Sequence, residues 1–385
     1  MAGPASRFPR LLTHPPPMRI ALVVERFEEC AGGGEQIVWN VARELRRAGD
    51  EVHVVARRGV ATPGVTLHRL RVPAFWQPLR VSSFAMLAGR ELRGAGFDVV
   101  HSYSRTLHQD LFHAGGGSHA DSMLKTYGEA GTRARRLSPR HALLLALERR
   151  IFADPSQTIE CVSEMVRSQI AERFAVPRER LTLLHYGVDV ERFEPERNAA
   201  AGRRLRDELR AADATVWLFA GSGWRRKGLD TALAALAGAE SRNTHLWVAG
   251  GDTVKPWQER ATRLGLAERV RFLGSRSDME SLYAAADGLL LPTRYDAFGL
   301  VCLEAAASGI PVVTCESAGA SELMHKAGVV VKRADDIAAF SGALDRLSDA
   351  GLRETLGAEG LRVAREKSWV HHVEGLRAIY RRISR

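Results

Sequence analysis

Two carboxylates, Asp296 and Glu304, stand eight residues apart on either side of a short glycine-containing segment. Phe298, Gly299 and Leu300 lie between them and open a predicted helix, so their backbone N–H groups point outward with the positive end of the helix dipole. Such amides bind a phosphate or a sugar hydroxyl, and carboxylates accept hydrogen bonds from hydroxyl groups. The pattern favours a polyhydroxylated, phosphorylated ligand such as a sugar nucleotide. The alternative is a surface acid, a helix cap and a glycine that share no function.

A basic turn in the same half of the chain offers cations. Arg226 and Lys227 come just after a predicted strand that ends at Gly221, and just before a predicted helix. Cations fixed at this point would stabilise the charge that gathers on a diphosphate leaving group in the transition state. We therefore expect Gly221, Arg226 and Lys227 to bind donor phosphates, with Arg226, Lys227 and Asp296 also catalytic. Arg225 is an alternative to Arg226, and a solvated basic turn is the alternative to the whole site.

Two glycine-rich segments occur in the first half. Gly33 and Gly34 precede a predicted helix that starts near Glu35, where a bare backbone and a helix end favour an anion. A flexible loop is the alternative reading of these glycines.

The segment 101–123 follows a predicted strand and is dense in polar groups. We predict Asp110 as a catalytic residue there, and His113, Gly116 and His119 as acceptor-binding residues. The alternative is that these histidines are structural or simply exposed.

The elements that must position these residues can be predicted from the apolar runs. These runs alternate with helical or loop material and fall into two series, at 19–24, 51–56, 97–102, 158–163 and 181–187, and at 215–221, 244–250, 269–274, 287–292, 310–314 and 328–332. Such alternation predicts an α/β fold with doubly wound parallel sheets covered by helices. Ligands bind such sheets at the carboxyl ends of the strands, which is where the predicted site residues fall.

The length agrees with two domains, because 385 residues exceed one ordinary hydrophobic core. A polar, charged segment around Glu194 reads as a linker, so we expect one domain over 18–193 and a second over 194–368. The Pro-rich residues 1–17 are expected to be a disordered or mis-assigned extension, with Met18 as the start.

The net charge of +10 calls for an anionic partner, which a phosphorylated substrate or an acidic membrane surface would satisfy. The chain has no RNP-like, helix-turn-helix or zinc-finger pattern, so we expect no nucleic acid partner. The four cysteines are scattered and form no CxxC pair, which favours free thiols in a reducing compartment. No Asp-x-Asp triplet occurs to hold a divalent ion to a nucleotide-sugar, and we predict no metal requirement.

The stretch Tyr295–Val313, YDAFGLVCLEAAASGIPVV, resembles the acidic signature of the retaining, family-4 glycosyltransferases. In that signature a carboxylate, seven residues and a Glu bracket an FG pair, followed by an EA-rich helix and a GxPVV strand. Asp296 stands where the family usually has Glu, whereas Glu304 matches. The RKG element at 226–228 also matches, and the likeness extends over nearly the whole chain after Met18. It includes several stretches similar to members that build the lipopolysaccharide core.

This resemblance implies the GT-B architecture, in which two Rossmann-like domains face each other across a cleft. It also implies that the last helix, here within 369–385, crosses back to complete the first domain. In donor binding it implies a ribose contact for Glu304, a contact near the uracil for Arg276, mostly through its backbone, and a diphosphate-facing glycine loop at Gly33 and Gly34. Retention is implied as well, with the leaving phosphate deprotonating the incoming hydroxyl on the same face.

We therefore expect a cytoplasmic hexosyltransferase of cell-envelope biosynthesis. It would move a hexose, glucose in first place, from a UDP-sugar to a lipopolysaccharide-core or related glycolipid acceptor, with retention and without a cofactor. Two alternatives stay open: a nucleotide-sugar 2-epimerase of GT-B fold, and a sugar-nucleotide-binding scaffold without turnover.

A basic amphipathic segment at 131–152 suggests where an acceptor anchored by lipid would be met. Its arginines precede a run of leucines, a pattern that suits the anionic inner face of the cytoplasmic membrane. The alternative is an ordinary helix that packs on the sheet of the first domain.

Overall fold

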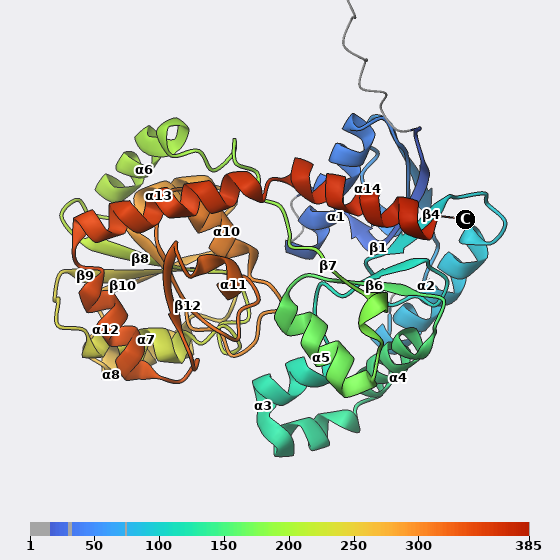
Figure 1. The fold of residues 1–385 in the computed structure, drawn as a ribbon. Helices are drawn as coiled ribbons and strands as arrows, with labels where there is room; N and C mark the ends of the chain where they lie inside the picture. The colour runs from blue at the N-terminus through green and yellow to red at the C-terminus, as the bar shows by residue number, and fades with distance from the viewer. Residues whose placement is uncertain (1–15, 30–32, 74, 385) are drawn as a thin grey trace, which may run out of the picture.

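The computed structural model describes residues 16–29, 33–73 and 75–384. These residues form two α/β lobes, each built on a parallel sheet, so the predicted fold class is confirmed (Figure 1). The expectation about residues 1–17 concerns a segment of which 1–15 lie outside the described residues.

The first lobe contains, in its described part, a seven-stranded sheet in the order β3-β2-β1-β4-β5-β6-β7, with all neighbours parallel. The interior of β1 is a continuous buried apolar run, as expected for a parallel strand with both faces covered. The strands are β1 (Arg19–Phe27), β2 (Glu51–Gly59), β3 (Val65–Arg69), β4 (Val99–Ser102), β5 (Leu111–His113), β6 (Thr158–Cys161) and β7 (Leu181–Leu183).

The second lobe contains a six-stranded parallel sheet in the order β10-β9-β8-β11-β12-β13. Its central strands β8 and β11 carry the basic turn and the acidic loop at their carboxyl ends, because parallel strands end at the same edge. The strands are β8 (Thr215–Ala220), β9 (Thr244–Ala249), β10 (Val270–Gly274), β11 (Gly288–Leu291), β12 (Val312–Cys315) and β13 (Gly328–Val331).

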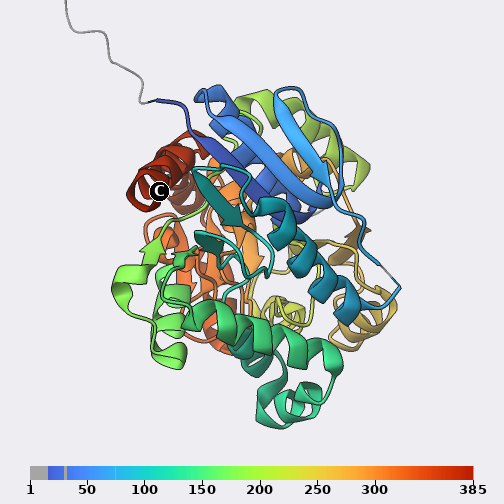
Figure 2. The ribbon, with the colours of Figure 1, turned by 90° about the vertical axis from the view of Figure 1, so that its right-hand side faces the viewer.

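Helices connect the strands in both lobes. Those of the first lobe are α1 (Gly33–Arg47), α2 (Gln77–Leu92), α3 (His119–Arg136), α4 (Pro139–Ala153) and α5 (Glu164–Phe174), with a 3-10 turn, η1, at Arg178–Arg180. Those of the second lobe are α6 (Pro195–Glu208), α7 (Leu229–Gly238), α8 (Lys255–Arg263), α9 (Met279–Ala285), α10 (Leu300–Ala307), α11 (Ser321–Met324), α12 (Ile337–Arg346) and α13 (Ala350–Glu366). Helices α3 and α4 extend from the lobe at the end away from β1 and β2 (Figure 2).

The last helix, α14 (Trp369–Ile383), follows α13 and returns to the first lobe, where it lies beside α1 (Figure 1). Two buried contacts hold it there. The Tyr380 hydroxyl lies 2.7 Å from His101 Nδ1, and Arg377 Nε lies 2.9 Å from Asp50 Oδ2. The chain therefore crosses twice between the lobes, once between β7 and α6 and once between α13 and α14.

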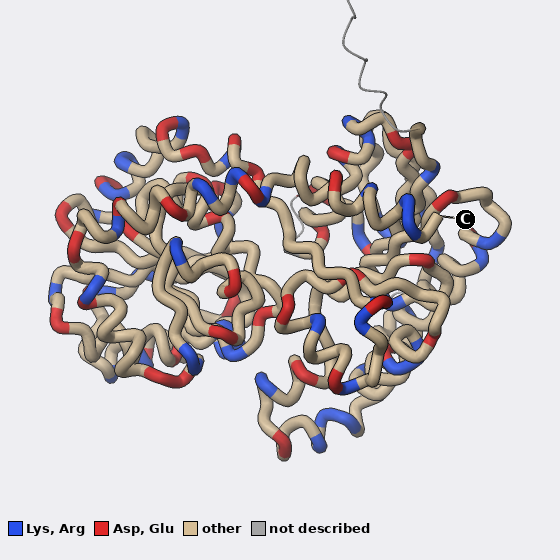
Figure 3. Tube along the Cα trace, in the orientation of Figure 1, with Lys and Arg blue, Asp and Glu red and all other residues tan. Residues whose placement is uncertain are grey.

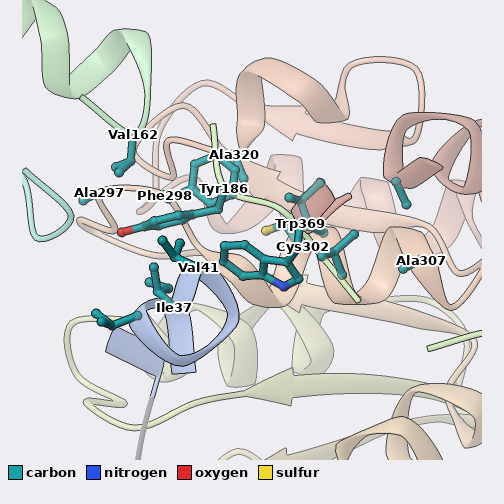
Figure 4. Packing of buried hydrophobic residues seen from close by; sticks show 14 of the residues in the cluster. Ile37, Val41, Val162, Tyr186, Ala297, Phe298, Cys302, Ala307, Ala320 and Trp369 are labelled. Carbon is teal, nitrogen blue, oxygen red and sulfur yellow. The ribbon is translucent and has the colours of Figure 1, made fainter. Parts of the chain in front are cut away.

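The lobes share a packed apolar core where they meet. Tyr186 of the first crossing contacts Phe298 of the acidic loop at a ring distance of 5.1 Å, and both rings are buried. Figure 4 shows this pair close to α1, which carries Ile37 and Val41, and close to Trp369 at the start of α14. Apolar contact at this point fixes the acidic loop against the first lobe.

Candidate active site

A cleft of about 1100 Å³ lies between the lobes. Its walls come from the ends of β1 and β5 in the first lobe and from the segments that follow β8 and β11 in the second. The donor-side residues predicted from the sequence that line it are Gly34, Gly221, Arg226, Lys227, Arg276, Asp296, Phe298, Gly299, Leu300 and Glu304. Gly33 is the first residue of α1, directly before Gly34, and the helix starts there rather than near Glu35.

Several backbone hydrogen bonds hold the acidic loop in place. Asp296 N–H donates to Ser317 O at 3.0 Å, and Gly319 N–H donates to Asp296 O at 3.0 Å. Gly299 precedes the first turn of α10 with a φ of 93°, a left-handed conformation that glycine adopts without strain. The short helix α10 therefore starts at Leu300 and directs its first N–H groups toward the cleft.

Arg226 and Lys227, the two cations of the basic turn, both lie close to the Asp296 carboxylate. Lys227 Nζ donates to Asp296 Oδ2 at 3.0 Å, and Arg226 Nη1 lies 3.7 Å from the same oxygen while it donates to Tyr295 O at 2.6 Å. Burial alone would raise the pKa of the Asp296 carboxyl, but Lys227 and Arg226 outweigh burial and hold that pKa below its usual value. A diphosphate entering the cleft would meet two cations that are already ordered.

Glu304 lies deeper in the cleft on α10. The Tyr283 hydroxyl donates to its Oε2 at 2.8 Å, and burial raises the pKa of the Glu304 carboxyl. Arg276 also lines the cleft, but its guanidinium donates two hydrogen bonds to Asp278, at 2.8 and 2.6 Å. Its Nε and Nη2 atoms are thus held by Asp278, beside the cleft.

The first-lobe wall contains His113 and the glycine loop, including Gly116. His113 Nδ1 lies 2.8 Å from Glu160 Oε2, and His113 Nε2 lies 2.7 Å from the Tyr186 hydroxyl. A Cβ added at Gly115 would overlap both His113 and Tyr186, so the loop can lie on this pair only without a side chain there.

The structure does not place Asp110 in the cleft, so its predicted catalytic role is corrected. Asp110 precedes β5 at the amino end of the strand, where its Oδ2 accepts a hydrogen bond from Val100 N–H at 2.9 Å. The cleft lies at the carboxyl ends of the strands, and Asp110 is outside its lining. Asp110 therefore precedes the strand β5 at its amino end, whereas His113 is the last residue of β5, at the cleft.

His119 is also outside the cleft, and its predicted role in acceptor binding is corrected. It begins α3, where its Nε2 lies 3.0 Å from His141 Nδ1 and the two rings stack at 5.2 Å. Burial, together with the nearby Arg105 and His141, lowers the pKa of His119 to about 4. His119 belongs to the contact between α3 and α4.

Glu160 and Tyr186 are parts of the site that the sequence did not predict. Glu160 is a charged residue between two buried apolar residues of the short strand β6, and that was the available signal. Together with His101 and His113 it forms a buried group whose ligand atoms lie within 4.8 Å of one another, a spacing that a metal ion could also use. The three side chains contact one another directly, because both histidines lie within 3.0 Å of Glu160 Oε2.

A second, smaller cavity of about 520 Å³ lies between α3 and the second lobe. Arg294 is paired there with Asp230, and it donates to Arg225 O at 2.6 Å. Lys125, Arg225 and Arg260 also line it, and none of the three has an ion-pair partner within the described part of the chain. The cavity thus carries an excess of positive charge beside the basic turn.

Two models of known protein families match this chain, one in each lobe. Residues 31–192 match the model described as Glycosyltransferase Family 4, and residues 214–350 match Glycosyl transferases group 1. The chain is 31% identical over 254 residues to the D-inositol 3-phosphate glycosyltransferase of Nocardia farcinica, a match covering 60% of this chain and 54% of that one. It is 30% identical over 190 residues to the lipopolysaccharide glucosyltransferase WaaG of Escherichia coli, covering 48% and 50%. These matches thus span about half the length of each relative.

Solved structures agree on the fold. The crystal structure of WaaG superposes with a TM-score of 0.81 at 23% identity, covering 94% of this chain and 99% of that one. Anabaena HepE in complex with UDP-glucose superposes with a TM-score of 0.72 at 18% identity, covering 95% and 100%. Together the two family models span most of the chain, and the chain therefore belongs to the glycosyltransferases of GT-B fold, with a Glycosyltransferase Family 4 segment in its first lobe and a Glycosyl transferases group 1 segment in its second.

Proposed function

We propose that the protein transfers a hexose from a UDP-sugar to a lipopolysaccharide-core or related glycolipid acceptor, and that this hexose is glucose. The observation that carries this proposal is the joint placement of Arg226, Lys227, Asp296 and Glu304 on one wall of the cleft. Two cations for a diphosphate and two acids for hydroxyl groups match the chemistry of a sugar nucleotide. The UDP-glucose held by the HepE structure and the lipopolysaccharide acceptor implied by the name of WaaG support the choice of donor and acceptor.

Each donor-side residue takes a role that follows from its position. Arg226 and Lys227 bind the diphosphate and stabilise the charge that develops as it leaves. The N–H groups that open α10 bind a phosphate oxygen or a sugar hydroxyl. Glu304 accepts hydrogen bonds from the ribose hydroxyls, and Asp296 accepts them from the transferred sugar.

Transfer then proceeds with retention of the anomeric configuration. The bond between the sugar C1 and the diphosphate oxygen breaks, and the acceptor oxygen forms a bond to C1 from the same face. The acceptor proton passes to the leaving phosphate. The two cations of the basic turn neutralise the leaving group, and no metal is required in this scheme.

The acceptor is an anionic glycolipid in this proposal. The second cavity, with Lys125 on α3 and Arg260 on α8, offers positive charge beside the basic turn. Guanidinium and ammonium groups suit phosphate and carboxylate. Since one relative is named for an inositol phosphate, a phosphorylated cyclitol is the second acceptor class to test.

Lipid anchoring of the acceptor places the α3–α4 turn at an anionic membrane surface. The basic amphipathic segment 131–152 spans the end of α3 and most of α4, with a break between Arg136 and Pro139, and Leu137 at the break is 86% exposed. Basic segments gather around this turn, whereas elsewhere both signs of charge mix over the two lobes (Figure 3). Leu145 and Leu147 of α4 pack inward, so the contact would rest on the turn itself. The described part of the chain has no helix both long and apolar enough to cross a bilayer.

The test is a panel of labelled nucleotide-sugars incubated with purified protein and glycolipid extract, with and without phosphatase treatment of the extract. Inositol phosphate is tested as a separate acceptor. Transfer of glucose from UDP-glucose, unaffected by EDTA and reduced by phosphatase treatment, is the expected result. Interconversion of UDP-GlcNAc without transfer would instead show a 2-epimerase, and UDP binding without turnover would show a scaffold.

Membrane association is tested separately by flotation with liposomes. Binding to vesicles that contain anionic lipid, lost when Leu137 is changed to Ser, is expected. No retention on such vesicles at physiological salt would contradict the membrane contact.

A further inference from the structure

A continuous chain of buried polar groups runs through the first lobe from α14 to the cleft. Its centre is Glu160, which is fully buried in β6. On one side His101 Nε2 lies 3.0 Å from Glu160 Oε2, and the Tyr380 hydroxyl lies 2.7 Å from His101 Nδ1. On the other side His113 Nδ1 lies 2.8 Å from the same oxygen, and Tyr186 completes the chain at 2.7 Å from His113 Nε2. Three adjacent strands, β4, β5 and β6, bring the central groups together.

The chemistry of Glu160 decides where the protons lie. A carboxylate only accepts hydrogen bonds, so the ring nitrogen that faces it on each histidine must carry a proton. His113 is therefore protonated at Nδ1, and its Nε2 shares a hydrogen bond with the Tyr186 hydroxyl. Burial alone would raise the pKa of the Glu160 carboxyl, but the interactions with His113 and His101 outweigh burial and lower that pKa.

Only one end of this chain reaches the cleft. His113 and Tyr186 line it, whereas His101, Glu160 and Tyr380 do not. The glycine loop lies directly on His113 and Tyr186, because a Cβ at Gly115 would overlap both. Tyr186 also packs edge-on against Phe298 of the acidic loop (Figure 4). The orientation of the His113 ring is thus coupled to both walls of the cleft.

We propose that Glu160 is a positioning residue for glycosyl transfer: it fixes the His113 ring, and through it the Tyr186 hydroxyl, beneath the glycine loop on the acceptor side of the cleft. The inference rests on the proposed function, which supplies the reaction. Glu160 acts without touching substrate. It fixes which His113 nitrogen is protonated and how the His113–Tyr186 pair is oriented when an acceptor binds.

The change Glu160→Gln tests this role while it keeps the shape of the side chain. Glutamine lacks the negative charge and presents an N–H₂ group where only acceptors fit, so one histidine must turn or lose its partner. For metal-binding histidines, loss of such an orienting partner costs roughly 10- to 100-fold in activity. We expect kcat for transfer to fall by about the same factor, with an unchanged KM for the UDP-sugar, because the cations and acids that bind the donor lie on the second lobe.

Tyr380→Phe is the matched control, because it breaks the same chain at the end away from the cleft. It should keep the wild-type kcat even if its melting temperature falls as much as that of Glu160→Gln. Tyr186→Phe should lower kcat as Glu160→Gln does, and combining the two should add little further loss. If Glu160 had only a structural role, Glu160→Gln and Tyr380→Phe would both lower stability and leave kcat per folded molecule unchanged. This result would overturn the proposal.

Proton–nitrogen NMR of histidine-labelled protein, together with metal analysis, tests the arrangement without relying on turnover. Two slowly exchanging ring N–H signals, at His101 Nε2 and His113 Nδ1, are expected in the wild type and in Tyr380→Phe, with at least one lost in Glu160→Gln. Their absence from the wild type would overturn the arrangement, as would one bound metal per chain that Glu160→Gln releases. If the arrangement is present and UDP binds but no sugar is transferred to any acceptor, it is the proposed function that fails.

Discussion

At the scale of single residues, Asp296 connects the acidic loop to the basic turn on the second-lobe wall of the cleft. Its carboxylate contacts Lys227, which is only 7% exposed, and lies close to Arg226. Aspartate is one methylene shorter than the glutamate usual at this position, so its carboxylate stays close to the backbone of the loop. The interaction orders the cations, but it also makes Asp296 a competitor for any phosphate that they bind.

Changing Asp296 to Asn should separate donor affinity from turnover. Without the competing charge, UDP should bind at least as tightly as to the wild type. Turnover should fall by about 10- to 100-fold, because a hydrogen bond to a charged group contributes about 1.5–3 kcal/mol. Calorimetry with UDP and a transfer assay measure the two effects. Asp335→Asn, which breaks an exposed pair with Arg333, serves as the control, and weaker UDP binding by Asp296→Asn would contradict the account.

The residues predicted correctly for the cleft are those whose position depends on local sequence. Arg226 and Asp296 each lie in the segment between a strand and the next helix, and such segments lie at the carboxyl edge of a parallel sheet, where the cleft is. Asp110 lies at the amino end of β5 and His119 lies beyond the glycine loop at the start of α3, so neither lines the cleft. A strand of only three residues leaves too short an apolar run to be predicted, so its position relative to Asp110 could not be predicted either. Glu160 could not be assigned a role, because its partners come from other strands and their register is a long-range property.

Elements hold the donor site through close backbone contacts. Gly228 ends the basic turn before α7 with a φ of 79°, and a Cβ there would overlap Pro292 O at the start of the acidic loop. Arg294 N–H, in turn, donates to Arg226 O at 2.8 Å. The basic turn and the acidic loop are therefore fitted to each other along their backbones as well as through Asp296.

Substituting Gly228 with Ala should weaken UDP binding, because the turn must move away from the acidic loop. Gly49→Ala is the matched control: its φ is 89°, but its Cβ would meet no atom within 4 Å. Both variants should lose about 1–2 kcal/mol of stability from the left-handed conformation. Only Gly228→Ala should also lose UDP affinity, and equal UDP affinities for both variants would contradict the fit between turn and loop.

Most strands were predictable because parallel strands leave continuous apolar runs in the sequence, but β3 and β5 of the first lobe were not predicted. The break between α3 and α4 was not predicted, although Ser138 and Pro139 mark it. Proline fits the first turn of a helix but not its interior, so the leucine run begins a new helix there. The leucines pack inward as a result, which is the alternative that the sequence had left open.

The whole molecule is held together by the crossing segments. His372 of α14 donates from Nδ1 to His185 O at 2.8 Å, and the His185 ring is itself paired with Glu322 of the second lobe. This contact ties the last helix to the first crossing. The return of α14 cannot be derived from hydrophobic patterning alone, because an amphipathic helix does not specify which lobe it covers.

The pH dependence of stability should report on this contact. Burial lowers the pKa of His372 to about 4, whereas a histidine in the unfolded chain titrates near pH 6.5. Between pH 6.5 and about 4 the unfolded chain therefore binds the additional proton, and stability falls as the pH falls. The drop in melting temperature from pH 7.5 to pH 5 should be smaller in His372→Asn than in the wild type. The exposed neighbour His371 provides the control, and identical drops for wild type and His372→Asn would show that His372 is not the group responsible.

The central claim is that Arg226 and Lys227 bind the donor diphosphate, and calorimetry with UDP on the double variant Arg226→Gln, Lys227→Gln tests it most directly. Loss of a buried, hydrogen-bonded charge contact costs about 2–5 kcal/mol, so affinity should fall by at least about 30-fold, with a comparable loss of turnover. Adding Asp296→Asn removes the carboxylate that the double variant leaves unpaired, and the loss of affinity should persist in that folded protein. Wild-type UDP affinity and turnover in these variants would contradict the account.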